Sequence, residues 1–282
     1  MSAAGPLPLV GRRVLVTGIA NEASLALPIA QVLRASGAEL VCAGLGPTPY
    51  HGALSTAAEQ YLGGAREAFE STVREHLGAD VPELIADVTL DPSLEDLAET
   101  LRLRDLQLDG IVHAVAMDRT IRGGAAKPLL QVTREEFLDC MSASAYSLLA
   151  LVRVLLRAHV LREGASIVAL SYLGAERVMS HPYRNIGVAK AALERLVREL
   201  AAELGPTFGM RVNAVRFSPW SRSKAGGAIP GLEEAVAHAA SRAPLGNADP
   251  ASLGCEVVHL LRPGLGVTGE VRHVDGGYHV HG

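Results

Sequence analysis

The chain has 282 residues, of which 49% are hydrophobic and only 4% aromatic, and its formal net charge is −4. This length can bury a large core, and a small charge without long runs of one sign disfavours nucleic acid or an anionic membrane as partner. The first eleven residues lack a basic start before an apolar core, and no unbroken apolar run reaches the ~18 residues of a membrane span. With Cys42, Cys140 and Cys255 scattered along the chain, we expect a cytoplasmic protein with reduced, buried or partly buried thiols.

Apolar, β-branched runs alternate with helical patterns along the whole chain, which predicts βα units wound into a parallel sheet. Strands are expected at residues 13–17, 39–43, 83–86, 110–116, 165–171, 211–217 and 270–274. Helices are expected at residues 25–35, around 55–76, and at 183–204, where Gly205-Pro206 would stop the last one. We therefore predict one domain, residues 1–282, with a Rossmann-like, doubly wound parallel seven-stranded sheet. The segment 44–80 has no evident role.

Residues 14–26 indicate a strand, a tight turn after Gly18 and the start of a helix, where backbone N–H groups could hold a pyrophosphate. The further glycines of the usual dinucleotide fingerprint are absent. Ser24, just before Leu25, could donate to a phosphate or cap the helix. Pro28 must lie in the first turn, because deeper in the helix it would remove a backbone hydrogen bond.

Two later strands end in residues suited to a nucleotide. Asp87 could accept from an adenine amino group with Val88 against the ring, although such an Asp is more typical of a turn. The fourth strand ends in His113-Ala114-Val115-Ala116, which would place backbone beside the ribose and nicotinamide; His113 itself is expected in the core or behind the site. We find no metal-ligand spacing, and His279 and His281 indicate an exposed terminus.

Tyr172, Tyr183 and Lys190 outline a hydride-transfer site. Tyr183 and Lys190 are seven residues apart, so on a helix they lie two turns apart on one face. The ammonium could bind ribose hydroxyls, and the phenols could donate to an oxygen that becomes negative. The alternative is two incidental tyrosines beside a surface helix. On the far face of that helix, Glu194 and Arg198 could pair.

After Pro219, Gly226-Gly227 and Pro230-Gly231 interrupt the chain, which predicts a mobile, substrate-binding lid at residues 218–245.

With these residues in place, the chain resembles the NADH-dependent enoyl-acyl-carrier-protein reductases, a divergent branch of the short-chain dehydrogenase/reductase superfamily. Tyr183 with six residues before Lys190 is the specific match, because ordinary members of the superfamily have three. The resemblance implies that Tyr183 hydrogen-bonds a thioester carbonyl, that Lys190 holds nicotinamide ribose hydroxyls and that Tyr172 lies beside the substrate. It implies cofactor contacts from Gly18, Ser24, Leu25, Asp87, Val88, Ala114 and Pro219. NADH, an enoyl thioester on acyl carrier protein or coenzyme A, and a homotetramer are further implications.

Several departures from the family pattern indicate a specialised relative. Residues 218–225 differ from the family's Gly-Pro-Ile-Arg-Thr, Trp220 adds a flat surface, and Arg222 with Lys224 could attract a carrier phosphate. One residue is inserted between Tyr172 and Tyr183. NADPH stays open, because strand two ends with neither an acid nor an arginine. Two other functions stay open: a carbonyl or alcohol dehydrogenase that uses Ser171, and a non-catalytic dinucleotide-binding protein.

Overall fold

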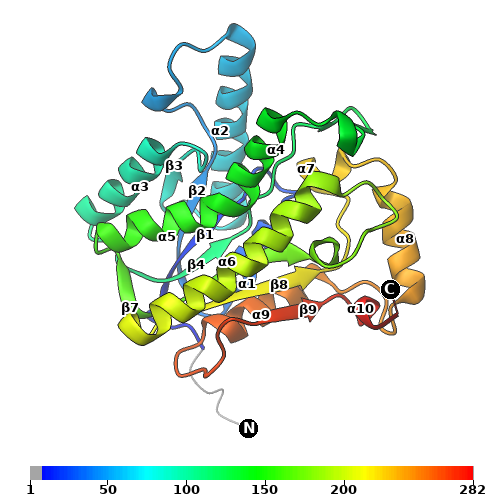
Figure 1. The fold of residues 1–282 in the computed structure, drawn as a ribbon. Coiled ribbons are helices and arrows are strands. Elements are labelled where there is room, and N and C mark those ends of the chain that lie inside the picture. Colours follow the sequence, from blue (N-terminus) through cyan, green and yellow to red (C-terminus); the bar gives the residue numbers. More distant parts are fainter. Residues whose placement is uncertain (1–7, 282) are drawn as a thin grey trace.

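The computed structural model describes residues 8–281, which fold around one sheet of seven parallel strands (Figure 1). The strand order is β3-β2-β1-β4-β7-β8-β9. The strands are β1 (Arg13–Thr17), β2 (Glu39–Gly44), β3 (Glu83–Ile85), β4 (Leu108–His113), β7 (Leu161–Tyr172), β8 (Arg211–Phe217) and β9 (Val271–Val274). A short antiparallel hairpin, β5 (Ile121–Arg122) and β6 (Ala125–Ala126), lies outside this sheet. The chain reverses its direction of travel across the sheet between β1 and β4, and this switch point opens a crevice at the carboxyl ends of the strands.

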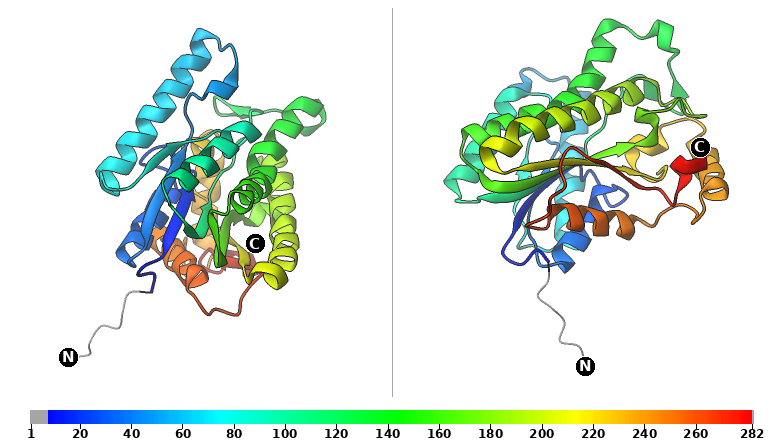
Figure 2. Two further views of the ribbon diagram at one scale, coloured as in Figure 1. Left: turned by 90° about the vertical axis from the view of Figure 1, so that its left-hand side faces the viewer. Right: turned by 60° about the horizontal axis from the view of Figure 1, so that its bottom comes forward.

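Helices cover both faces of the sheet, which gives three layers (Figure 2). One layer contains α1 (Ala26–Ala35), α2 (Thr56–His76) and α9 (Pro250–Leu261), and the other contains α3 (Asp91–Leu103), α5 (Ser147–Arg157) and α6 (Arg184–Phe208). The central strands are apolar on both faces because each face packs against a helical layer. The remaining helices are α4 (Arg134–Met141), α7 (Lys224–Gly227), α8 (Leu232–Arg242) and α10 (Tyr278–His281).

The sequence predictions of the fold are confirmed, with shifts at element ends. Each predicted strand is present, and the predicted helix at 55–76 is α2, which Ser55 caps through a hydrogen bond from the Ala58 N–H. Pro28 lies in the first turn of α1, as expected.

The predicted end of α6 is wrong. The helix continues through Pro206 to Phe208 and ends at Gly209, whose φ of +64° suits glycine. Phe208 packs against the core, and this contact holds a last turn that lacks only the hydrogen bond of the Pro206 nitrogen.

The segment from Arg134 to Arg157, which joins α4, a π-helical turn (Ser142–Tyr146) and α5, is long and apolar enough to cross a membrane. Most of this segment is buried in the protein, where Leu148, Leu151 and Leu155 belong to the main core. It is therefore a core helix here. Cys42 and Cys140 are buried free thiols, but Cys255 points outward from α9 and is exposed, which corrects the expectation of burial for that residue.

Candidate active site

A pocket of about 160 Å³ lies at the carboxyl ends of β4, β7 and β8. Its lining comes from the turn after β1, the ends of these three strands, the start of α6 and the segment after β8. The residues that matter for chemistry are Leu25, Ala114, Tyr172, His181, Tyr183, Lys190 and Pro219. The predicted phenols and ammonium therefore share one cavity with three residues predicted to contact the cofactor, Leu25, Ala114 and Pro219. The same cavity contains His181, which was not predicted.

Tyr172 and Tyr183 meet edge to face, with ring centroids 5.0 Å apart. Tyr172 is the last residue of β7, and Tyr183 immediately precedes α6, so the β7–α6 connection brings the two rings together. The Tyr172 hydroxyl is buried without a partner among residues 8–281. Burial raises the pKa of both phenols, so that each is a neutral O–H donor at physiological pH.

Lys190 extends from the second turn of α6 into the same pocket. Its Nζ donates to the carbonyl oxygens of Val115, at 3.0 Å, and Leu170, at 2.8 Å. Burial lowers the pKa of this ammonium to about 8. Because an ammonium has three N–H donors, the two carbonyls fix its position and leave one donor for a ligand.

A buried charge network lies directly beneath these residues. Arg216 on β8 makes two hydrogen bonds to Glu194 on α6, at 2.7 and 2.6 Å, and a third to Glu176. Ser171 donates to the same Glu194 carboxylate at 2.6 Å. The expected Glu194–Arg198 pair is therefore wrong: the Glu194 side chain faces the sheet, where Arg216 and Ser171 satisfy it.

The turn after β1 is closely packed against the end of β4. Gly18 has a φ of +93°, and a Cβ at this position would lie 2.2 Å from the Ala114 carbonyl oxygen. The Ser24 hydroxyl accepts from the N–H groups of Ala20 and Asn21, so it shapes the turn. Ser24 does not cap α1, because Leu25 precedes the helix without a side-chain hydrogen bond, which corrects that alternative.

Asp87 has the predicted turn role and a second contact that the sequence did not predict. One carboxylate oxygen accepts from the N–H and hydroxyl of Thr89, which is the turn role, and the other lies 3.1 Å from Nε2 of His51. His51 belongs to the previously unassigned segment 44–80, and sequence reasoning missed it. Val88 packs beside the core.

The segment after β8 forms one wall of the pocket. Pro219 and Trp220 line it, and the Trp220 indole donates to the Ala23 carbonyl oxygen at 3.1 Å. Arg222 and Lys224 are exposed; the Lys224 ammonium lies 4.4 Å from the centre of the Tyr61 ring on α2. This wall is thus joined to the turn after β1 and to α2.

His181 is a pocket residue that the sequence analysis did not identify. Its ring lies 5.7 Å from that of Tyr172 and 5.9 Å from that of Tyr183. The only signal was its position in the lengthened β7–α6 connection, two residues before Tyr183. By contrast, His113 is confirmed as a core residue: it is fully buried, its Nε2 bonds Ser147, and burial lowers its pKa to about 3.

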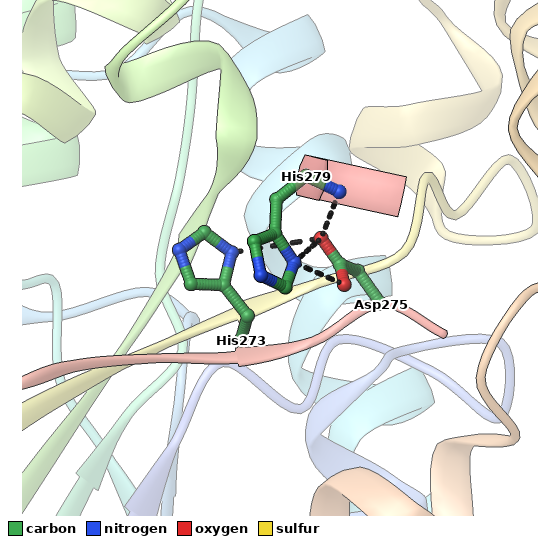
Figure 3. A group of neighbouring side chains, drawn as sticks. All are labelled: His273, Asp275 and His279. Carbon is green, nitrogen blue, oxygen red and sulfur yellow. Dashed lines mark hydrogen bonds and ion pairs between the residues drawn. The ribbon is translucent and has the colours of Figure 1, made fainter. Parts of the chain in front are cut away.

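His273, Asp275 and His279 gather near the C-terminus (Figure 3). Asp275 accepts from the backbone N–H groups of Gly277 and His279, and the His279 ring lies 2.9 Å from its carboxylate. His279 is therefore anchored and only partly exposed, whereas His281 is exposed, as expected. The two imidazoles stack, with ring centroids 3.9 Å apart and planes inclined by 26°. These contacts fasten the end of the chain.

Comparison with known proteins agrees with this geometry. A family model described as enoyl-(acyl carrier protein) reductase matches residues 18–279. The chain is 36% identical to the enoyl-[acyl-carrier-protein] reductase [NADH] FabI of Aquifex aeolicus, over 97% of this chain and 93% of that protein. It is 33% identical to the Escherichia coli FabI, over 96% and 95%.

Solved structures show the same fold. The Bacillus cereus enoyl-acyl carrier protein reductase with NADP+ and an indole naphthyridinone has a TM-score of 0.81 and 32% identity, covering 98% of this chain and 99% of that one. A FabI–NADH complex from Alistipes finegoldii has a TM-score of 0.83 and 26% identity, covering 97% and 90%. On this evidence, the chain belongs to the enoyl-acyl-carrier-protein reductase family.

Proposed function

We propose that this protein reduces the α,β double bond of an enoyl thioester with hydride from NADH. One observation carries the proposal: Tyr172, Tyr183 and Lys190 converge in a single pocket at the carboxyl edge of the sheet. The family's reductase activity and the NADH named for its members in A. aeolicus and E. coli support the same reaction.

The residues around the pocket fit a nicotinamide nucleotide. Because Gly18 has no side chain, the turn after β1 can pack against Ala114, and Leu25, Ala114 and Pro219 line the same pocket as Lys190. In our proposal Lys190 holds the ribose hydroxyls, the turn through Ser24 holds the pyrophosphate, and Asp87 with Val88 faces the adenine. When bound, NADH would supply the hydride for the β-carbon of the substrate.

The protein stabilises the charge that develops on the thioester carbonyl oxygen. The neutral Tyr183 phenol donates to this oxygen, and the fixed Lys190 ammonium adds a positive charge behind it. A pre-positioned donor of this kind contributes roughly 3–4 kcal/mol to catalysis, since it needs no reorganisation as the charge forms. We assign Tyr172, whose hydroxyl has no partner among the described residues, to the substrate side of the pocket.

Ser171 decides against carbonyl reduction. A dehydrogenase that binds a ketone oxygen through this serine would need its hydroxyl proton, but that proton is donated to Glu194 at 2.6 Å. Glu194 is in turn fixed by Arg216. The serine is thus part of the support beneath the site.

The carrier, the quaternary structure and the compartment are further parts of the proposal. We propose an acyl-carrier-protein thioester as substrate, with the changed segment 218–225 and a lid at 218–245 suited to a specialised acyl chain. Exposed apolar side chains on neighbouring elements, Leu138, Tyr146 and Val188, support a homotetramer. We propose the cytoplasm as its compartment. Light scattering of the purified protein measures the number of subunits.

The reaction is tested with crotonyl and acetoacetyl thioesters, each with NADH, while NADH absorbance is followed. We expect NADH oxidation with the crotonyl thioester only. Tyr183→Phe should lower kcat/KM on the order of 100-fold, whereas Tyr50→Phe, at an exposed tyrosine, should not. Oxidation with only the acetoacetyl thioester would reject enoyl reduction, and binding of NADH without turnover of either thioester would indicate a dinucleotide-binding protein.

A further inference from the structure

His181 has hydrogen-bonding capacity that the protein does not use. The side chain is buried, with 3% of the residue exposed, and it lines the pocket beside the two tyrosines. Within the described chain, neither Nδ1 nor Nε2 has a hydrogen-bond partner, and the adjacent Tyr172 hydroxyl has none either. Three polar atoms thus lie buried and unpartnered at one side of the cavity.

Such a group is costly unless something satisfies it, because a buried polar atom loses its bonds to water. His113 shows what a structural histidine of this fold does instead: it lies outside the pocket lining and bonds Ser147 through Nε2, although its Nδ1 has no partner among the described residues. His181 has no equivalent contact. Its unpartnered nitrogens in the substrate pocket therefore point to a ligand.

We propose that His181 and Tyr172 form a polar subsite that binds one neutral donor–acceptor group of the substrate, next to the reacting thioester. This inference rests on the proposed enoyl reduction and specifies its substrate. A neutral imidazole offers one donor and one acceptor, and the Tyr172 hydroxyl adds a further donor. A hydroxyl on the acyl chain, or an amide in the carrier arm, has the matching pair.

The charge state of His181 agrees with a neutral ligand. Burial lowers the pKa of its imidazole to about 4, so the ring carries no charge at physiological pH. A carboxylate or phosphate would find no counter-charge at this side of the pocket, since Tyr172 and Tyr183 are neutral as well. The subsite therefore selects for hydrogen bonding rather than for charge.

Three thioesters distinguish the sources of the group. The crotonyl thioester of butanethiol has neither group, the N-acetylcysteamine thioester adds an amide in the carrier arm, and a 4-hydroxy-enoyl butanethiol thioester adds a hydroxyl on the acyl chain. For each polar thioester, the ratio of its kcat/KM to that of the plain crotonyl thioester measures the preference for the polar group. We expect this ratio to be about 10- to 100-fold lower in His181→Leu than in the wild-type protein for one of the two polar thioesters. His181→Gln, which restores a donor and an acceptor, should recover most of that ratio.

His76→Leu, at an exposed histidine near the end of α2, is the matched control and should keep both the activity and the ratio. If both ratios are unchanged in His181→Leu, the subsite does not exist, even where overall activity falls. Calorimetry with the corresponding saturated thioesters measures the same preference without turnover. This binding measurement tests the subsite even if the wild-type protein reduces none of the enoyl thioesters. A lack of reduction would reject the proposed function, not the subsite.

Discussion

At the scale of single residues, the position of Lys190 explains how a charge can be kept in a buried pocket. Two backbone carbonyls, those of Val115 and Leu170, replace part of the water that the ammonium has lost. They do so incompletely, because burial still lowers its pKa from 10.5 to about 8. The ammonium is thus charged at neutral pH but loses its proton within the range of an ordinary pH profile.

This pKa predicts that NADH binding weakens in alkali. A depressed pKa means that Lys190 is charged below about pH 8 and neutral above it, so the attraction for the nucleotide is lost as pH rises through that value. Fluorescence titrations from pH 6.5 to 9.5 should show a constant Kd followed by a rise. Lys190→Met should bind weakly at every pH, and a wild-type Kd that stays level up to pH 9.5 would contradict the assignment.

Arg216 and Arg195 make a matched pair of ionic contacts for measuring the effect of burial. Arg216 is bonded to the buried Glu194, whereas Arg195 pairs with Glu199 on the exposed face of α6. Arg216→Met leaves a buried carboxylate without its partner, so we expect a loss of about 3–5 kcal/mol in the free energy of unfolding. Arg195→Met should change it by about 0.5 kcal/mol or less, as urea unfolding would measure. Equal losses would mean that Glu194 is not stabilised by Arg216.

At the scale of elements, the connection from β7 to α6 sets the geometry of the site. The Tyr183 ring packs directly over Gly174, where a Cβ would lie 2.4 Å from the ring. Gly187 lies in the first turns of α6, and a Cβ added there would lie 2.8 Å from the Gly174 carbonyl oxygen. The two glycines therefore let the connection and the helix approach each other with the phenol between them.

Gly174→Ala should displace the Tyr183 ring and lower kcat/KM on the order of 10- to 100-fold, since small misplacements of a catalytic group are expensive. Gly64→Ala is the control, because this glycine lies in α2 with nothing within 4 Å of an added Cβ. It should keep full activity and stabilise the protein by about 0.5–1 kcal/mol. Steady-state kinetics and urea unfolding of both variants give the comparison; unchanged kinetics in Gly174→Ala would show that the ring position is not critical.

At the scale of the whole molecule, binding of a nucleotide at the turn after β1 should raise the free energy of unfolding. A ligand that binds only the folded state adds about 2.7 kcal/mol at a concentration 100-fold above its Kd. We expect NADH to raise Tm more than NADPH does, because the end of β2 has no basic residue for a 2′-phosphate.

The Tm increase should be lost in Gly18→Ala, which places a methyl group 2.2 Å from the Ala114 carbonyl oxygen. Gly11→Ala is the control, because Gly11 also has a positive φ but has open space around it. This variant should be destabilised yet still respond to NADH in a thermal unfolding assay. An equal Tm increase in both variants would show that the turn after β1 does not bind the cofactor.

The sequence by itself determined the sheet and the centre of the site. Strands buried on both faces are rich in apolar and β-branched residues, and Arg13–Thr17 and Arg211–Phe217 were predicted residue for residue. The seven-residue spacing of Tyr183 and Lys190 is a local property of a helix and its first turn, and it placed both groups in one pocket.

Only the tertiary structure decided the partners of the remaining polar groups. Glu194 was expected to pair one turn along its helix but faces β8, and Asp87 meets a histidine 36 residues earlier in the chain. His181 gave no periodic signal, because it lies in an irregular connection whose path depends on the packing of both tyrosines. Hydrophobic periodicity reports which face of an element is buried, whereas hydrogen bonds and ion pairs depend on atoms that distant segments bring within about 3 Å, and no local pattern specifies these contacts.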